Sequence, residues 1–174
     1  MNDHAVMILL GIASVATAIS GFSGVVAVFA GRTDGKWAPA ERFRTTNMLI
    51  LSLGACLLSF VPLTGEMFQI SNGTTWMFSS LLLGLFCAAY FTYTIGMIRK
   101  LNLLRPGALI VWVGIVYFIC LILAVILQVI NAVGILTASG PGPFIAGLIL
   151  MLVPAGLQFA FLVLTPLTSD NLKI

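Results

Sequence analysis

Five long apolar runs in this sequence contain no Asp, Glu, Lys, Arg or His, and the last two are separated only by the uncharged turn 137–143. A helix needs about 20 mostly apolar residues to cross the hydrocarbon core of a bilayer, and a charged side chain at that depth is costly. We therefore predict an all-α integral membrane protein, built as a five-transmembrane-helix bundle in a single membrane domain over residues 1–174. Its spans are expected at about 5–31, 46–63, 75–98, 107–136 and 144–167.

The composition leaves little room for a water-soluble fold. Only 7% of the residues are charged, 60% are hydrophobic, and the mean hydropathy is +1.16. Soluble domains contain roughly 25% charged residues. The alternating strands of an outer-membrane barrel are not seen in the pattern. The N-terminus, MNDHAVMILL, lacks the basic segment that precedes the apolar part of a signal peptide, so we expect the first span to be uncleaved.

The basic residues fall between the spans in an uneven way. Of the eight Lys and Arg, four lie in residues 32–45, three in residues 99–106 and one in the C-terminal tail. Five spans place all three segments on one side of the membrane, whereas four would place basic residues on both sides. By the positive-inside rule we expect an N-terminus outside and a cytoplasmic C-terminus, in a bacterial inner membrane or its equivalent.

The two basic loops are expected at the headgroup level, where they would fix the topology of the chain. A docking surface for anionic lipid or a protein partner is the alternative. Pro39 suits the first turn of a helix that continues into the second span, and Pro62 is expected to end or kink that span. Trp76 is predicted to be an interfacial anchor of the third span. The residues predicted to contact headgroups are Trp37, Arg42, Arg44, Arg99, Lys100 and Arg105.

Small residues recur at spacings of four in the first and third spans. Such rows let helix backbones approach closely inside a membrane. We predict that each row packs against a neighbouring helix, while a narrow passage or a lipid-binding slot along the third span is the alternative. The two predicted grooves consist of Ser80, Gly84, Ala88, Thr92 and Gly96, and of Ala16, Ser20 and Gly24.

Three amide side chains lie inside spans: Gln128, Asn131 and Gln158. An amide in hydrocarbon seeks a hydrogen-bond partner on another helix, so we interpret these residues as interhelical links, with a polar ligand site as the alternative. Pro154 lies one turn before Gln158 and is expected to kink the fifth span and free a backbone carbonyl near residue 150.

Little in the sequence points to chemistry. Proton and cation transporters usually carry an ionisable group at membrane depth, and no such group lies near the middle of a span. The single histidine, His4, cannot form a bis-histidine haem site. Cys56, Cys87 and Cys120 lie in three different spans and are expected to be buried apolar side chains. We predict no catalytic residue, no metal site and no nucleic-acid partner, and no cofactor, although bound lipid, quinone or pigment stays open.

Three functional hypotheses remain. The first is a non-catalytic accessory or structural subunit that packs with other membrane proteins or with itself, in contact with membrane lipids. The second is a small channel or transporter for a neutral or apolar solute, which would use Gln128, Asn131, Gln158 and the break at Pro154. The third is a lipid-binding or lipid-modifying membrane protein, which would use the basic loops.

Overall fold

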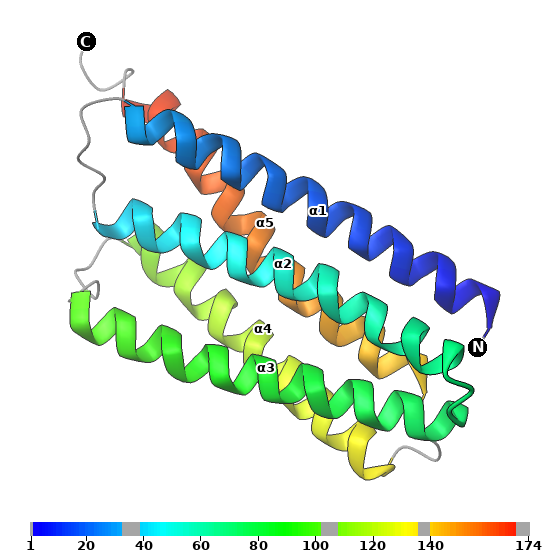
Figure 1. Ribbon diagram of the computed structural model, residues 1–174. Coiled ribbons are helices and arrows are strands. Elements are labelled where there is room, and N and C mark those ends of the chain that lie inside the picture. The colour runs from blue at the N-terminus through cyan, green and yellow to red at the C-terminus, as the bar shows by residue number, and fades with distance from the viewer. Residues whose placement is uncertain (1, 33–38, 102–107, 136–139, 170–174) are drawn as a thin grey trace.

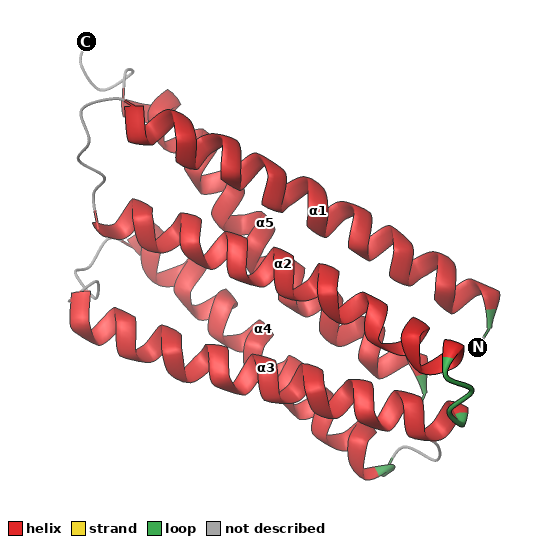
Figure 2. Cartoon of the chain, in the orientation of Figure 1, coloured by secondary structure: helices red, strands yellow, loops and turns green. Residues whose placement is uncertain are grey.

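The computed structural model describes residues 2–32, 39–101, 108–135 and 140–169 of the chain. These residues form five helices and, within these ranges, no strands (Figures 1 and 2). The helices are α1 (Asp3–Arg32), α2 (Pro39–Met67), α3 (Asn72–Leu101), α4 (Ala108–Val133) and α5 (Pro141–Ser169). All five are long and apolar enough to span a membrane, which confirms the all-helical, five-helix part of the prediction.

The helices pack in two layers. In Figure 1, α1, α2 and α3 lie side by side, and α4 and α5 lie behind them. Helix α5 contacts each of the other four, whereas α1 contacts only α2 and α5 among the described residues. The core is apolar along most of its length and includes Leu51, Leu83, Leu121 and Leu148, all fully buried. One face of α1 therefore has no neighbour within the described chain.

Two helix ends follow from local backbone geometry. Gly134 has φ +72°, and the N–H of Ile135 donates to the carbonyl of Ile130 at 3.2 Å, which together form the left-handed cap that commonly ends a helix. At the end of α2, Gln69 takes the same role with φ +55°, and Ile70 donates to Gly65 at 3.1 Å. Helices α2 and α4 run in the same direction, so both end at the end of the bundle where α3 and α5 begin (Figure 1).

Helix α2 differs from its predicted bounds. It begins at Pro39, as expected, but it does not end at Pro62 and continues to Met67. A proline removes one backbone donor from a helix, and the turns on either side of that position can still keep their hydrogen bonds. Residues 39–45 belong to α2, in line with the predicted start at Pro39, whereas Arg99 and Lys100, expected in the second basic loop, form part of the last turn of α3. The helices at these positions thus extend beyond the apolar spans predicted from the sequence.

The two ends of the bundle differ in charge. The first turns of α2 and the last turn of α3 lie at one end and carry Arg42, Arg44, Arg99 and Lys100 (Figure 1). We call this the basic end. Asp3, His4 and Glu66 lie at the other end, which we call the acidic end. All the cationic side chains that the structure describes are at the basic end.

Trp76 does not lie where an interfacial anchor would. It is only 3% exposed, and its ring packs on the ring of Phe144 with centroids 5.9 Å apart and planes tilted by 55°. It therefore joins the start of α3 to the start of α5 inside the bundle. An interfacial tryptophan keeps its indole N–H in contact with water, and burial against Phe144 does not leave the ring exposed in that way.

Candidate functional site

Asn131 is the centre of a hydrogen-bonded cluster near the acidic end. Its side-chain amide donates to the hydroxyl of Ser80 at 2.7 Å and to the carbonyl of Gly140 at 3.1 Å. Its amide oxygen accepts from the N–H of Gly140 at 3.1 Å. Asn131 is 1% exposed and Ser80 is fully buried. A single side chain therefore joins α4 to α3 and to the residue just before α5.

Gln128 lies one turn away from Asn131 on α4 and is also fully buried. Its amide N–H donates to the carbonyl of Pro143 at 2.9 Å, in the first turn of α5, while its side-chain oxygen has no partner. Two glycines make room for it. A Cβ on Gly84 of α3 would lie 3.2 Å from the Cβ of Gln128, and a Cβ on Gly147 of α5 would collide with its amide nitrogen. Gln128 is thus held between α3 and α5.

The predicted groove on α3 faces α4 at one end only. Ser80 and Gly84 are buried, Ala88 is half-buried, and Thr92 and Gly96 are exposed. The physical reason is the pitch of the helix. Each residue turns by about 100°, so a row with a strict spacing of four advances about 40° per step and about 160° from Ser80 to Gly96. Such a row cannot present all its members to one straight neighbour.

The row on α1 is shorter and stays closer to one face. Ala16 is fully buried, and Ser20 and Gly24 are half-buried. A different set of small residues lies on the face of α1 that points away from the bundle. These exposed residues are spaced by three, four and three, and they are Gly11, Ser14, Ala18 and Gly21. We call them the outer seam of α1.

A second group of buried polar side chains lies nearer the basic end. Gln158 of α5 is 8% exposed, and its side-chain oxygen has no partner. Asn47 of α2 and Tyr90 of α3 are also buried, and each has an unpartnered side-chain oxygen. The hydroxyls of Thr94 and Tyr117 share a hydrogen bond of 3.1 Å between α3 and α4. The structure does not place Gln158 with Gln128 and Asn131, which lie toward the acidic end.

Several of these residues were not among those predicted from the sequence. Asn47 could have been found by the signal that identified Gln128 and Asn131, an amide within an apolar run. Thr94, Tyr117 and Gly147 gave no such signal, because their roles depend on which helix faces them.

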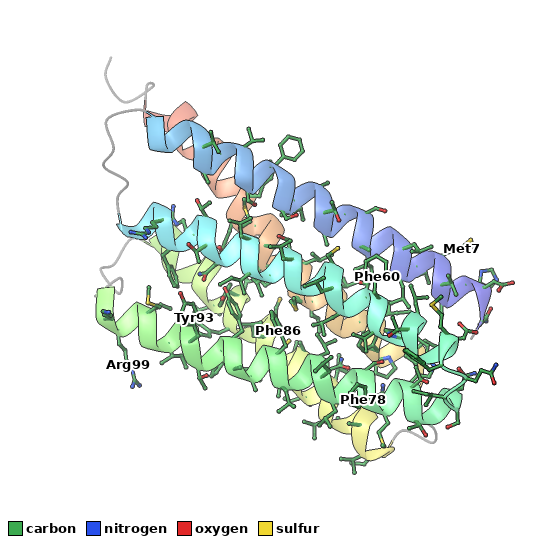
Figure 3. All side chains as sticks on the ribbon, in the orientation of Figure 1. Met7, Phe60, Phe78, Phe86, Tyr93 and Arg99 are labelled. Atoms are coloured by element: carbon green, nitrogen blue, oxygen red, sulfur yellow. The ribbon has the colours of Figure 1, made fainter. Side chains whose placement is uncertain are left out.

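The predicted headgroup residues are only partly described. Arg42, Arg99 and Lys100 are exposed at the basic end, and Arg44 is half-buried (Figure 3 labels Arg99). Trp37 and Arg105 lie outside the described residues. The described cysteines are free thiols, of which Cys87 and Cys120 are buried and Cys56 is half-buried. The hydroxyl oxygen of Thr17 on α1 lies 3.4 Å from the sulfur of Cys56 on α2, so this thiol contributes to the α1–α2 contact.

Comparisons with protein-family models, with curated proteins and with solved structures find no match to this chain.

Proposed function

We propose that this chain is a non-catalytic integral membrane protein whose role is assembly, as an accessory or structural subunit that associates with another membrane protein or with a second copy of itself. The observation that carries this proposal is that the buried amides of Asn131 and Gln128 hydrogen-bond to neighbouring segments of the bundle. Their hydrogen bonds join α3, α4 and the start of α5. In an apolar solvent such bonds hold helices in a fixed arrangement. Buried amides committed to neighbouring helices support a packing role for this half of the bundle.

The surface we assign to the partner is the outer seam of α1. Helix α1 packs on α2 and α5 alone among the described helices, and a Cβ on Gly11, Gly21 or Gly24 would meet no atom within 4 Å. Small side chains at alternating spacings of three and four return to one face of a helix. A second transmembrane helix could therefore approach this face closely.

Association is tested by purification in a mild detergent, with mass measured by light scattering. We expect the wild-type chain to exceed the 18.5 kDa of one copy, and mass spectrometry identifies whether the added mass is a second copy or another membrane protein. Gly21→Leu is expected to reduce the complex at least tenfold, because leucine prevents close approach. Gly114→Leu on α4 is the matched control, since a Cβ there also meets nothing within 4 Å. A wild-type chain that is a lone monomer contradicts the proposal.

We further propose that the basic end faces the cytoplasm of a bacterial-type inner membrane and that the N-terminus lies outside. The charge difference between the two ends supports this orientation by the positive-inside rule. Single cysteines are introduced at Asn72 and at Lys100, both exposed, in a chain whose native cysteines are alanine. In intact spheroplasts a membrane-impermeant maleimide should label Asn72→Cys, and should label Lys100→Cys only after permeabilisation. The reverse pattern would mean that the orientation is inverted.

A further inference from the structure

Three buried side-chain oxygens in the half of the bundle nearer the basic end have no hydrogen-bond partner. They are Oδ1 of Asn47, Oε1 of Gln158 and the hydroxyl of Tyr90, which lies beside the hydroxyls of Tyr117 and Thr94, in residues that are 1%, 8% and 5% exposed. Buried polar atoms in proteins are nearly always hydrogen-bonded. Asn131 follows that rule with protein partners for both ends of its amide, whereas Oε1 of Gln128 and the hydroxyl of Thr75, toward the acidic end, are also unpaired. The three oxygens nearer the basic end differ from these two because they come from three helices that meet in one region.

The helix register brings these residues to one part of the bundle. At Gly54, a Cβ would collide with the ring of Phe86 and lie 2.8 Å from the methyl of Met151, so α2, α3 and α5 meet at this point. On α2, Asn47 lies seven residues from Gly54 toward the basic end. On α5, Gln158 lies seven residues from Met151 in the same direction. Seven residues make nearly two turns, which keeps a side chain on the same face about 10 Å further along.

Helix α3 places hydroxyls in the same region. Tyr90 lies one turn beyond Phe86 toward the basic end, with the two rings nearly parallel and their centroids 6.3 Å apart. The ring of Tyr117 lies 6.4 Å from that of Tyr90, and Tyr117 shares its hydrogen bond with Thr94. In Figure 3 this region lies along α3 between the labelled Phe86 and Arg99. We call the group Asn47, Tyr90, Thr94, Tyr117 and Gln158 the polar layer.

The atoms of the polar layer that lack a hydrogen-bond partner are mainly acceptors. Amide oxygens such as those of Asn47 and Gln158 can only accept. The missing partner is therefore a donor. None of the five residues is acidic, and an uncompensated charge in an apolar interior is costly, so a neutral donor fits better than a cation.

We propose that the polar layer is an internal binding site for a small neutral molecule that donates hydrogen bonds through O–H groups. Water is the smallest such molecule, and a small phenol offers the same O–H group on an organic molecule. Binding at this site is independent of lateral association through α1. The two possible sources of the O–H group are distinguished by the experiment.

The test uses the full chain in lipid nanodiscs with ¹⁵N-labelled asparagine and glutamine side chains. The probes are water, through cross-peaks to the side-chain amides, and hydroquinone, through chemical-shift changes. In 1,4-dimethoxybenzene, the control compound, both O–H groups are capped. We expect the amides of Asn47 and Gln158 to respond to water or to hydroquinone, and to respond to dimethoxybenzene at least tenfold more weakly. The amide of Asn131, fully bonded within the protein, is the internal control and should not respond.

If Asn47 of α2 and Gln158 of α5 bind the same molecule, a substitution at one position should change the response of the other. Asn47→Leu should weaken the response of Gln158 at least tenfold, and Gln158→Leu should weaken that of Asn47. Ser59→Ala is the matched control, because Ser59 is buried and its hydroxyl donates only to Ala55 of its own helix. A response to water alone supports the site with water as the occupant, and a response to hydroquinone supports an organic occupant. The proposal is overturned if both amides are as silent as that of Asn131, or if the response of each survives leucine at the other position.

Discussion

Gly147→Ala is expected to destabilise the bundle by about 2 to 3 kcal/mol, because an added methyl group has no room at this position and displaces a hydrogen-bonded side chain. A Cβ there would collide with the amide nitrogen of Gln128 and lie 3.1 Å from both Cδ of Gln128 and a methyl of Leu83. Gln128 cannot move aside freely, since its amide donates to Pro143 at 2.9 Å. Unfolding in mixed detergent micelles, titrated with SDS, measures the change.

Gly156→Ala is the matched control for this substitution. It lies on the same helix, α5, and a Cβ there meets nothing within 4 Å. Alanine favours a helix over glycine by up to about 1 kcal/mol, so this variant should be as stable as the wild type or slightly more stable. A second check removes the Gln128 side chain, which is the group that a methyl at position 147 would meet. The loss of stability in the double variant Gln128→Ala, Gly147→Ala should be smaller than the sum of the losses in the two single variants. Equal stability of Gly147→Ala and Gly156→Ala would refute the close approach of α4 and α5.

The helices could be predicted from the sequence because two local properties determine them. A backbone in hydrocarbon must bond its own polar groups, which leaves a helix as the form of a long uncharged run. The turn residues and charges between runs then mark the connections. The pattern predicts five helices but not all of their ends, because a charge marks the limit of an apolar span and the helix can continue past it. Arg99, for example, interrupts an apolar run and yet belongs to α3.

The packing of the helices could not be predicted in the same way. The importance of Gly147 depends on Gln128, which approaches it from another helix, and no spacing within α5 reveals this. The row from Ser80 to Gly96 shows the opposite error, in which regular spacing suggested one groove although the helix carries Thr92 and Gly96 away from α4. Gln128 and Asn131 were recognised because an amide is conspicuous in an apolar run. Ser80 was predicted only as a packing residue, and Gly140 and Pro143 were not predicted at all, since hydrogen-bond partners on other helices depend on the tertiary arrangement.

Asn131→Leu is expected to be the second strongly destabilising change, by about 2 to 3 kcal/mol. An interhelical hydrogen bond in a membrane protein contributes about 0.6 kcal/mol on average and up to about 1.7. The substitution removes one such bond, to Ser80, and two more to Gly140 just before α5, and it leaves the Ser80 hydroxyl and the N–H of Gly140 without their donor and acceptor. Unpaired buried groups add about 1 to 3 kcal/mol, against which leucine gains some apolar contact. The same SDS titration measures the result.

Two further variants separate lost hydrogen bonds from a general disturbance of the interior. Ser14→Ala removes an exposed hydroxyl that bonds only to Leu10 of its own helix, so it should change stability by less than about 0.5 kcal/mol. Ser80→Ala removes one partner of Asn131, and its effect should shrink when Asn131 is already leucine, because the two residues then no longer share a bond. If Asn131→Leu were as stable as the wild type, or if the effects of the two substitutions simply added, the link between α3 and α4 would contribute nothing to stability. The assembly role would then lose its main support, because the buried amides would be present for another reason.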